Sequence, residues 1–558
     1  MAIQINQIEL QLKVTMYKQG AFKFQQRRHE DWNDNYRLYR DKVILNRLTQ
    51  RQTVNIPLMK ETIRTLLSKI DDAPDITFED LGNDKQIENE VNEYWKYFYD
   101  SMNLEIKDVV DKKQIGLYGR SWKKLNIRNS MIYVEILDPM DVLIDEFVDP
   151  SDIETANYIC HQHIYRTLSE VANNEYYDAS AIQNLELFYA TQAGLIKSQE
   201  NAEALRARNQ KMGDMGYVDV DNPLVGEVWV ELNEHFIKLY DRETGEAIIY
   251  VVTTCGRETL MAKPLKEILG INFFPFESWA DDVERTDFYS DGPGDIVRTP
   301  NILINSWFAQ LSENRTLRNY NMKYYDSTDD DFVPQTYEPV PWGWYGVPGN
   351  PNDKIKDVQV SELTDSLNEI NFAIGIVERA TATTATEKGV ATQNKITLGE
   401  IELINAKAME RITSMSKFYR ISWKRFAEKW IALLEANADK LEEQELYKKN
   451  SKGDYIPRIV RPSKLVSPKG WRVIVTSSSE QEQKTLETLK KFEAIKAQMP
   501  DNKPLDKIFK KKMLGMVELR PDEEKEIMDY EEQHAENPLP GGPGVIMPDM
   551  APAMAPVK

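Results

Sequence analysis

The stretch from Ile296 to Leu434 constrains the fold most, because it ends in a long, uninterrupted amphipathic helical pattern. Apolar residues recur there at steps of three or four, which keeps them on one face of a helix. No Gly or Pro follows Gly399 within the pattern, so we expect a rod roughly 50 Å long at about 1.5 Å per residue. Such a rod exceeds the core of one compact domain and is typical of a protein that works in an assembly. The stripe consists of Ile401, Ile404, Ala408, Ile412, Met415, Tyr419, Trp423, Phe426, Trp430 and Leu434.

Two shorter helical patterns precede this rod. The first is expected to begin at Pro300, with Thr299 as its N-cap, and the second is expected to begin after the N-cap Ser361. Residues 332–349, which lie between them, contain four prolines and several aromatic residues. This composition is unsuited to a helix and predicts short edge strands packed on a neighbour. Residues 381–397 break the apolar pattern and predict a loop ahead of the rod.

The first 290 residues predict an α+β body. Helical periodicity is found at 58–70, 87–99 and 104–118. Strand patterns joined by turn residues predict hairpins at 121–137 and 228–252. Residues 270–295 are expected to be a loop-rich connector. After the rod, 455–478 is strand-like, 481–499 and a short segment from Pro521 are helical, and 537–558 has the composition of a disordered tail.

Composition narrows the class of protein. The net charge of −20 disfavours a tight, non-specific coat on nucleic acid but allows a wall past which DNA slides. The two cysteines, Cys160 and Cys255, are expected to be reduced thiols rather than a disulfide frame. No window approaches about 18 consecutive apolar residues, so we expect a protein made and used in a soluble compartment.

Catalytic motifs are not found in the sequence. No phosphate-binding glycine loop, zinc-protease motif or nucleophile elbow occurs. His161 and His163, expected on one face of a strand beside Cys160, would need distant partners to hold zinc, and packing or surface histidines are the alternative. The acidic runs 281–282 and 329–331 have the ligand type of a Mg²⁺ site, with solvated loops as the alternative. We therefore predict no catalytic, cofactor-binding or metal-binding residue.

Four short segments occur in the order found in one family of viral proteins. They are Gly119-Arg120-Ser121-Trp122-Lys123, Leu137-Asp138-Pro139-Met140-Asp141 ahead of Ile144-Asp145, Gly292-Pro293-Gly294-Asp295, and Thr384-Ala385-Thr386-Glu387 before the rod. In these segments and in the order of its helices, the chain resembles the tailed-bacteriophage portal proteins over about residues 30–535.

The resemblance implies a dodecameric ring at one capsid vertex of the virion, assembled in the host cytoplasm. Such a ring conducts double-stranded DNA during packaging and ejection. It docks the terminase large subunit and then head–tail connector proteins, and it also meets major capsid and scaffolding proteins. Family members are not enzymes and need no cofactor, since the terminase hydrolyses the ATP. The fold class implied is α+β, mainly α, with long helices and small β-hairpin sheets.

The resemblance also divides the chain. Residues 1–290 would form the wing, 291–325 stem helix 1, 326–360 the clip, 361–380 stem helix 2, 381–397 the channel loop, 398–476 the long wing helix with a β-hairpin, 477–535 the helical crown and 536–558 a disordered tail. The DNA-facing loop residues would be Thr384, Thr386, Lys388, Gly389, Thr392, Gln393 and Lys395. The clip residues that contact terminase or connector would be Trp342, Trp344 and Tyr345.

Alternatives stay open at each of these points. Lys388 and Lys395 have an ordinary solvated-loop interpretation, and the clip aromatics have one in which they pack within a single subunit. At the level of function, a Mg²⁺-dependent nuclease or phosphotransferase on the acidic loops is one competing hypothesis. Another virion connector or scaffold ring that does not bind terminase is the other.

Overall fold

The computed structural model describes residues 7–41, 56–70, 74–192, 229–240, 245–319, 323–325, 349–350, 355–357, 361, 363, 366–381, 383, 398–449 and 455–476. The chain divides into two compact units. The first is Met1–Glu442 with Pro462–Ser477, and the second is Glu443–Arg461 with Ser478–Lys558. Helix makes up 51% and strand 25% of the described residues, which confirms a mixed helix-and-strand chain in which helix predominates.

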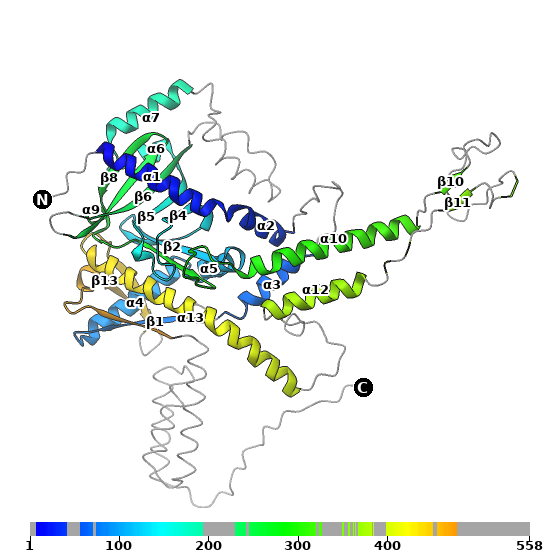
Figure 1. Cartoon of the computed structure of the whole chain (residues 1–558). Coiled ribbons are helices and arrows are strands. Elements are labelled where there is room, and N and C mark those ends of the chain that lie inside the picture. The colour runs from blue at the N-terminus through cyan, green and yellow to red at the C-terminus, as the bar shows by residue number, and fades with distance from the viewer. Residues whose placement is uncertain are drawn as a thin grey trace, which may run out of the picture. The chain divides into compact units, whose positions relative to one another are not determined.

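The first unit contains nearly all described elements (Figure 1). Its helices are α1 Gln7–Gln26, α2 His29–Tyr39, α3 Leu58–Leu67, α4 Lys85–Ser101, α5 Leu104–Tyr118, α6 Leu168–Ala172, α7 Ala179–Gln192, α9 Leu265–Leu269, α10 Pro293–Asn319, α12 Ser366–Thr381 and α13 Leu398–Ala436. Its strands are β1 Asp75–Asp80, β2 Arg120–Arg128, β3 Met131–Leu137, β4 Val142–Ile144, β5 Tyr158–Thr167, β6 Trp229–Tyr240, β7 Ala247–Cys255, β8 Glu258–Pro264, β9 Phe276–Ala280, β10 Lys323–Tyr325, β11 Ile355–Asp357 and β14 Trp471–Thr476. In the second unit, β12 Gln444–Lys449 pairs antiparallel with β13 Tyr455–Val460.

Two antiparallel sheets organise the body. One has the strand order β4-β5-β6-β7-β8 and the other the order β3-β2-β9. The predicted β2–β3 hairpin is confirmed, with positive φ angles at the turn residues Asn129 and Ser130. The predicted pairing of β6 with β7 is confirmed as well. β2 lies in the middle of the smaller sheet and pairs with both β3 and β9, and its first six residues are buried on both faces of the sheet.

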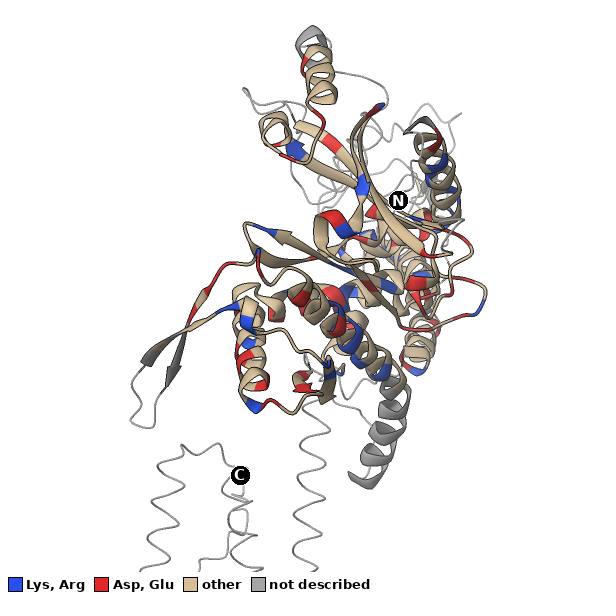
Figure 2. Ribbon diagram, turned by 90° about the vertical axis from the view of Figure 1, so that its left-hand side faces the viewer, with Lys and Arg blue, Asp and Glu red and all other residues tan. Residues whose placement is uncertain are grey.

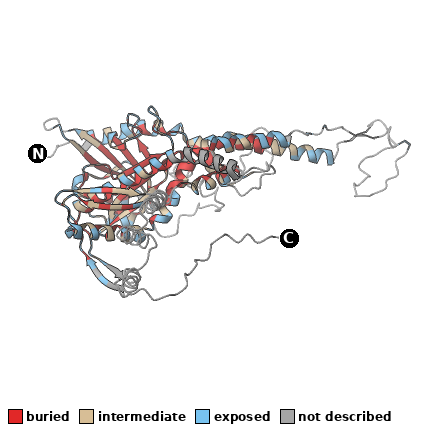
Figure 3. Cartoon of the chain, turned by 90° about the horizontal axis from the view of Figure 1, so that it is seen from below, coloured by how far each residue is buried: buried red, intermediate tan, exposed pale blue. Residues whose placement is uncertain are grey.

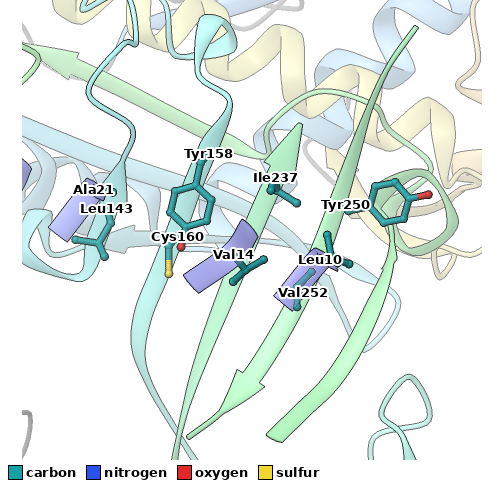
Figure 4. Close-up of a cluster of buried hydrophobic side chains, with 9 residues drawn as sticks. All are labelled: Leu10, Val14, Ala21, Leu143, Tyr158, Cys160, Ile237, Tyr250 and Val252. Carbon is teal, nitrogen blue, oxygen red and sulfur yellow. The ribbon is translucent and has the colours of Figure 1, made fainter. Parts of the chain in front are cut away.

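Helix α1 covers one face of the five-stranded sheet. Its residues Leu10, Val14 and Ala21 belong to a buried cluster with side chains of β4 to β7 (Figure 4). Burial of these apolar side chains supplies the main stabilisation of this layer. Cys160 belongs to the same cluster, and both Cys160 and Cys255 are free and buried.

The long helix is confirmed as α13, which has 39 residues. Stripe residues from Met415 to Leu434 are buried, while the side chains of 398–413 lie outside the described part. Trp430 packs edge-on against Trp95 of α4, with ring centroids 4.8 Å apart, and contacts Phe78 of β1. The buried half of α13 is therefore held in the body by aromatic contacts.

Three expectations about the middle of the chain are wrong. The connector 270–295 contains β9, a strand buried at every position that pairs with β2. Helix α10 begins at Pro293 instead of Pro300, so Thr299 is not its N-cap. Helix α12 begins at Ser366 instead of following Ser361. Pro300 lies within α10. Proline lacks the N–H that forms a hydrogen bond in a helix interior and is common in the first turn, so in the sequence Pro300 resembles the start of a helix.

Helices α10 and α12 lie side by side (Figure 1). The chain between them contains β10 and β11, which pair antiparallel, so the segment that includes the expected clip begins and ends in a two-stranded ladder. The first half of α10 is packed into the body, and its second half is exposed or half-buried (Figure 3). The expected clip aromatics, channel-loop residues, crown and tail lie outside the described residues. Among the described helices, none combines the length and apolarity needed to cross a membrane.

Candidate functional site at the start of α10

Three of the segments that carry the portal resemblance meet at one junction. Gly119 ends α5, and Gly292 comes directly before α10. A Cβ atom on Gly292 would lie only 2.5 Å from the Gly119 nitrogen, and one on Gly119 would lie 2.4 Å from the Ser290 oxygen. Gly119 also has a φ of +75°, a conformation that glycine adopts without the strain other residues incur. The two backbones therefore touch because neither residue has a side chain.

The third segment, around Pro139, joins the junction through α1. Gln25 is fully buried, and its Nε2 donates to the carbonyl oxygens of Pro139 and Val142, both at 2.7 Å. Trp32 of α2 packs edge-on against Tyr118 and Tyr289, which flank the two glycines. Segments distant in sequence are thus fixed to one another by a buried amide and an aromatic cluster.

Asp295 is the electrostatic centre of this junction. Its carboxylate pairs with Arg28 and Arg298, each at 2.8 Å, although the Asp295 side chain is only 7% exposed. It also accepts hydrogen bonds from the Gly292 nitrogen at 3.0 Å and from Asn35 Nδ2 at 3.1 Å. A carboxylate in the first turn interacts favourably with the positive end of a helix. Asp295 therefore links α2 to the first turn of α10.

Two further acidic residues ahead of α10 are paired with arginine. Asp287 pairs with Arg27 at 3.1 Å, and Asp291 pairs with Arg28 at 2.7 Å. Burial, followed by the charge of the adjacent Asp282, raises the pKa of Asp281 to about 7. Within the described ranges, no three His, Cys, Asp or Glu side chains are grouped as metal ligands. The other acidic run of the Mg²⁺ hypothesis, 329–331, lies outside the described residues.

The histidine segment of β5 departs from regular strand geometry. A bulge lies between His161 and Ile164, and His163 has a positive φ of 59°. This interrupts the alternation from which His161 and His163 were expected to share a face. His161 is buried, and its Nδ1 lies 3.1 Å from Lys124 Nζ. Burial and the Lys124 charge lower its pKa to about 2, while His163 bonds to Asp141 at 2.8 Å.

A buried network of charges was missed by the sequence interpretation. Asp111 of α5 accepts from Lys123 Nζ at 2.7 Å and from Trp279 Nε1 at 2.9 Å. Asp108, one turn earlier, accepts from Lys112 Nζ at 2.7 Å and from the hydroxyl of Tyr419 in α13. The i, i+4 pair of Asp108 and Lys112 was visible in the sequence. The partners on β2, β9 and α13 were not, because only the fold brings them together.

Helices α10 and α12 carry apolar side chains on their outer faces. Along α10, Ile296, Leu303 and Leu317 are exposed at multiples of seven residues, which keeps them on one side. On α12, Phe372 and Ile376 are exposed one turn apart, whereas Ala373 and Val377 are buried. The inner sides of the two helices carry Ile370, buried on α12, and Val297, Asn301 and Ile304, buried on α10. Two outward apolar stripes on neighbouring helices are typical of surfaces that pack against another chain.

No protein-family model matches this sequence, and no curated protein matches it either.

Proposed function

We propose that this chain is one subunit of a portal-type ring at a capsid vertex, through which double-stranded DNA enters and leaves the capsid. The observation that carries the proposal is the order of the helices from α10 to α13. Two adjacent helices with outward apolar stripes are followed by a 39-residue helix, and the first of them is rooted in a glycine junction. A subunit that lines a passage needs such a pair of helices anchored firmly at one end.

The charge of the chain supports a passage for DNA. A net charge of −20 repels phosphates over most of the surface, so a duplex slides past without being trapped. The channel would be completed by the loop of residues 381–397, and the clip of residues 326–360 would dock the terminase large subunit and then connector proteins. The ring itself would carry out no catalysis.

The state of the acidic side chains ahead of α10 favours this proposal over a nuclease. A two-metal or one-metal nuclease needs charged carboxylates that are free to bind Mg²⁺. Asp281, on which the nuclease hypothesis rests, is half-buried, and burial raises its pKa to about 7. The nearby Asp287, Asp291 and Asp295 are paired with arginines near the start of α10. Their role in this proposal is to stabilise the junction.

Mass measurement tests the proposal. Light scattering on the purified full chain should give about twelve times the 64.7 kDa mass of one chain, and negative-stain images should show rings with a central hole. A monomer under every condition of salt and concentration would contradict it. Mg²⁺-dependent cleavage of DNA that is abolished by Asp281→Ala or Asp330→Ala would favour the nuclease hypothesis instead.

A further inference from the structure

The outer side of helix α5 is more apolar than that of an ordinary surface helix. Its inner side buries the charged residues Asp108 and Asp111 together with Leu104 and Ile115, while its outer side carries exposed apolar residues. Ile106 is 67% exposed, Val109 58% and Val110 42%. Helices of globular proteins normally place apolar residues inward and charged residues outward. We call Ile106, Val109 and Val110, which are spaced i, i+3 and i+4, the α5 outer face.

The inner charges of α5 are fully accounted for. Lys112 and Lys123 neutralise Asp108 and Asp111, and hydroxyl and indole groups complete their hydrogen bonds. These paired charges therefore fix the rotation of α5 about its own axis. In this orientation Ile106, Val109 and Val110 are exposed to water, and exposed apolar residues that lie together mark an interaction surface in a folded protein.

The exposed side of α13 has a complementary character. Ile421 is exposed there, between Lys417 and Lys424, which lie about one turn away on either side. We call these three residues the α13 outer face, and Figure 2 shows Lys and Arg along this part of the helix. Within the described part of the chain, Lys424 forms a long, exposed pair with Glu428 at 3.8 Å. The α5 outer face is bordered at its start by the exposed carboxylate of Glu105 and at its end by the half-buried Lys113.

The two faces point away from each other within one subunit. Helices α5 and α13 contact through the hydrogen bond from Tyr419 to Asp108. In an α-helix, residues i and i+2 point in directions that differ by about 200° around the helix axis. Val110 therefore points away from this contact on α5, and Ile421 points away from it on α13. Different, complementary faces directed to opposite sides form a heterologous, head-to-tail interface that repeats from copy to copy.

We infer that the α5 outer face of one copy docks on the α13 outer face of a second copy. Apolar contact of Ile421 with Val109 and Val110 would be flanked, at the Glu105 end of the α5 outer face, by attraction between Glu105 and the lysines. The contact rests on the proposed function in one respect, since closure of the repeat into a ring is part of that proposal.

Disulfide trapping in the full-length protein tests this contact. The variant with both Val109→Cys and Ile421→Cys should form, on mild oxidation, a ladder of covalent multimers, since each copy carries both halves of the contact. Mixing the two single variants should give covalent dimers only. Cys160 and Cys255 are 0% and 2% exposed, so the natural chain provides the unlinked background. As a matched control, Leu81→Cys with Ile421→Cys uses a similarly exposed apolar position in the turn after β1 and should give no ladder.

The outcomes separate this inference from the proposed function. Rings that form normally but give no ladder would overturn the α5–α13 contact and leave the channel proposal standing. Covalent dimers from Val109→Cys alone would also overturn it, because they would show two α5 faces meeting each other. Glu105→Lys should weaken assembly, and adding Lys424→Glu should restore it. A ladder without closed rings would support the contact and contradict the channel.

Discussion

Asp111→Ala is the most informative single change, because it removes the centre of the buried charge network. Asp111 is fully buried and accepts from Lys123 Nζ at 2.7 Å and Trp279 Nε1 at 2.9 Å, with Ser121 as a further donor. Without this carboxylate, the ammonium group of Lys123 stays buried and loses the negative charge that lies 2.7 Å away in the natural chain. Its remaining contacts are a long hydrogen bond of 3.4 Å to Ser422 and cation–π contacts with the rings of Trp423 and Trp279, at 5.2 and 6.0 Å from the ring centroids.

The expected loss of folding free energy is about 3–5 kcal/mol, the cost typical of removing one partner from a buried pair. At about 1.4 kcal/mol per tenfold change, the folded-to-unfolded ratio falls by roughly a hundredfold to several thousandfold. The matched control is Glu428→Ala, which removes an ion pair with Lys424 at 3.8 Å between side chains about half exposed. Pairs of that kind contribute only about 0–1 kcal/mol.

Urea denaturation followed by tryptophan fluorescence measures both variants, with the first transition compared because the chain has two units. A second variant separates charge from packing. Asp111→Leu combined with Lys123→Met replaces the pair by apolar groups and should recover most of the lost stability, since a buried pair is often no better than an apolar replacement. If Asp111→Ala and Glu428→Ala shift the midpoint equally, the network does not hold α5, β2 and β9 together as argued.

Three further predictions concern pH, the glycine junction and assembly. Burial raises the pKa of Glu277 from 4.5 to about 7. Its contribution to stability is therefore greatest below about pH 4.5 and is lost as the pH rises to about 7. Glu277→Gln should reduce this fall in the denaturation midpoint, measured from pH 4.5 to 7.5, and an unchanged slope would contradict the prediction. Gly292→Ala should destabilise by about 1–3 kcal/mol in thermal melts, because its Cβ would overlap the Gly119 backbone, whereas Gly375→Ala, which has open space, should be neutral or stabilising. Leu303→Asp should reduce ring formation in light scattering while leaving the circular dichroism of the chain unchanged, and equal assembly would argue against the α10 stripe.

Local periodicity was sufficient to predict some of the regular elements. The stripe that ends at Leu434 predicted α13, and the apolar runs around Arg128-Asn129-Ser130 predicted the β2–β3 hairpin. Strand β9 was missed because Glu277 and Ser278 make it look like a loop, although both are buried in the sheet. The start of α10 was misplaced because Pro300 resembles a first-turn proline, whereas the helix begins seven residues earlier beside Asp295.

The junction and the network show why the rest could not be predicted from one sequence. Gly119 and Gly292 are each ordinary glycines in the chain, and only their contact explains why neither position accommodates a side chain. Asp111 and Lys123 likewise show no special pattern in the sequence. Only the packing of α5 against β2 buries both side chains, so that each neutralises the charge of the other. Such contacts join segments distant in sequence, so no periodic pattern encodes them. The exposed apolar residues of α5 follow from the same cause: Asp108 and Asp111 face inward to reach partners on α13, β2 and β9, so Ile106, Val109 and Val110 lie on the outer side.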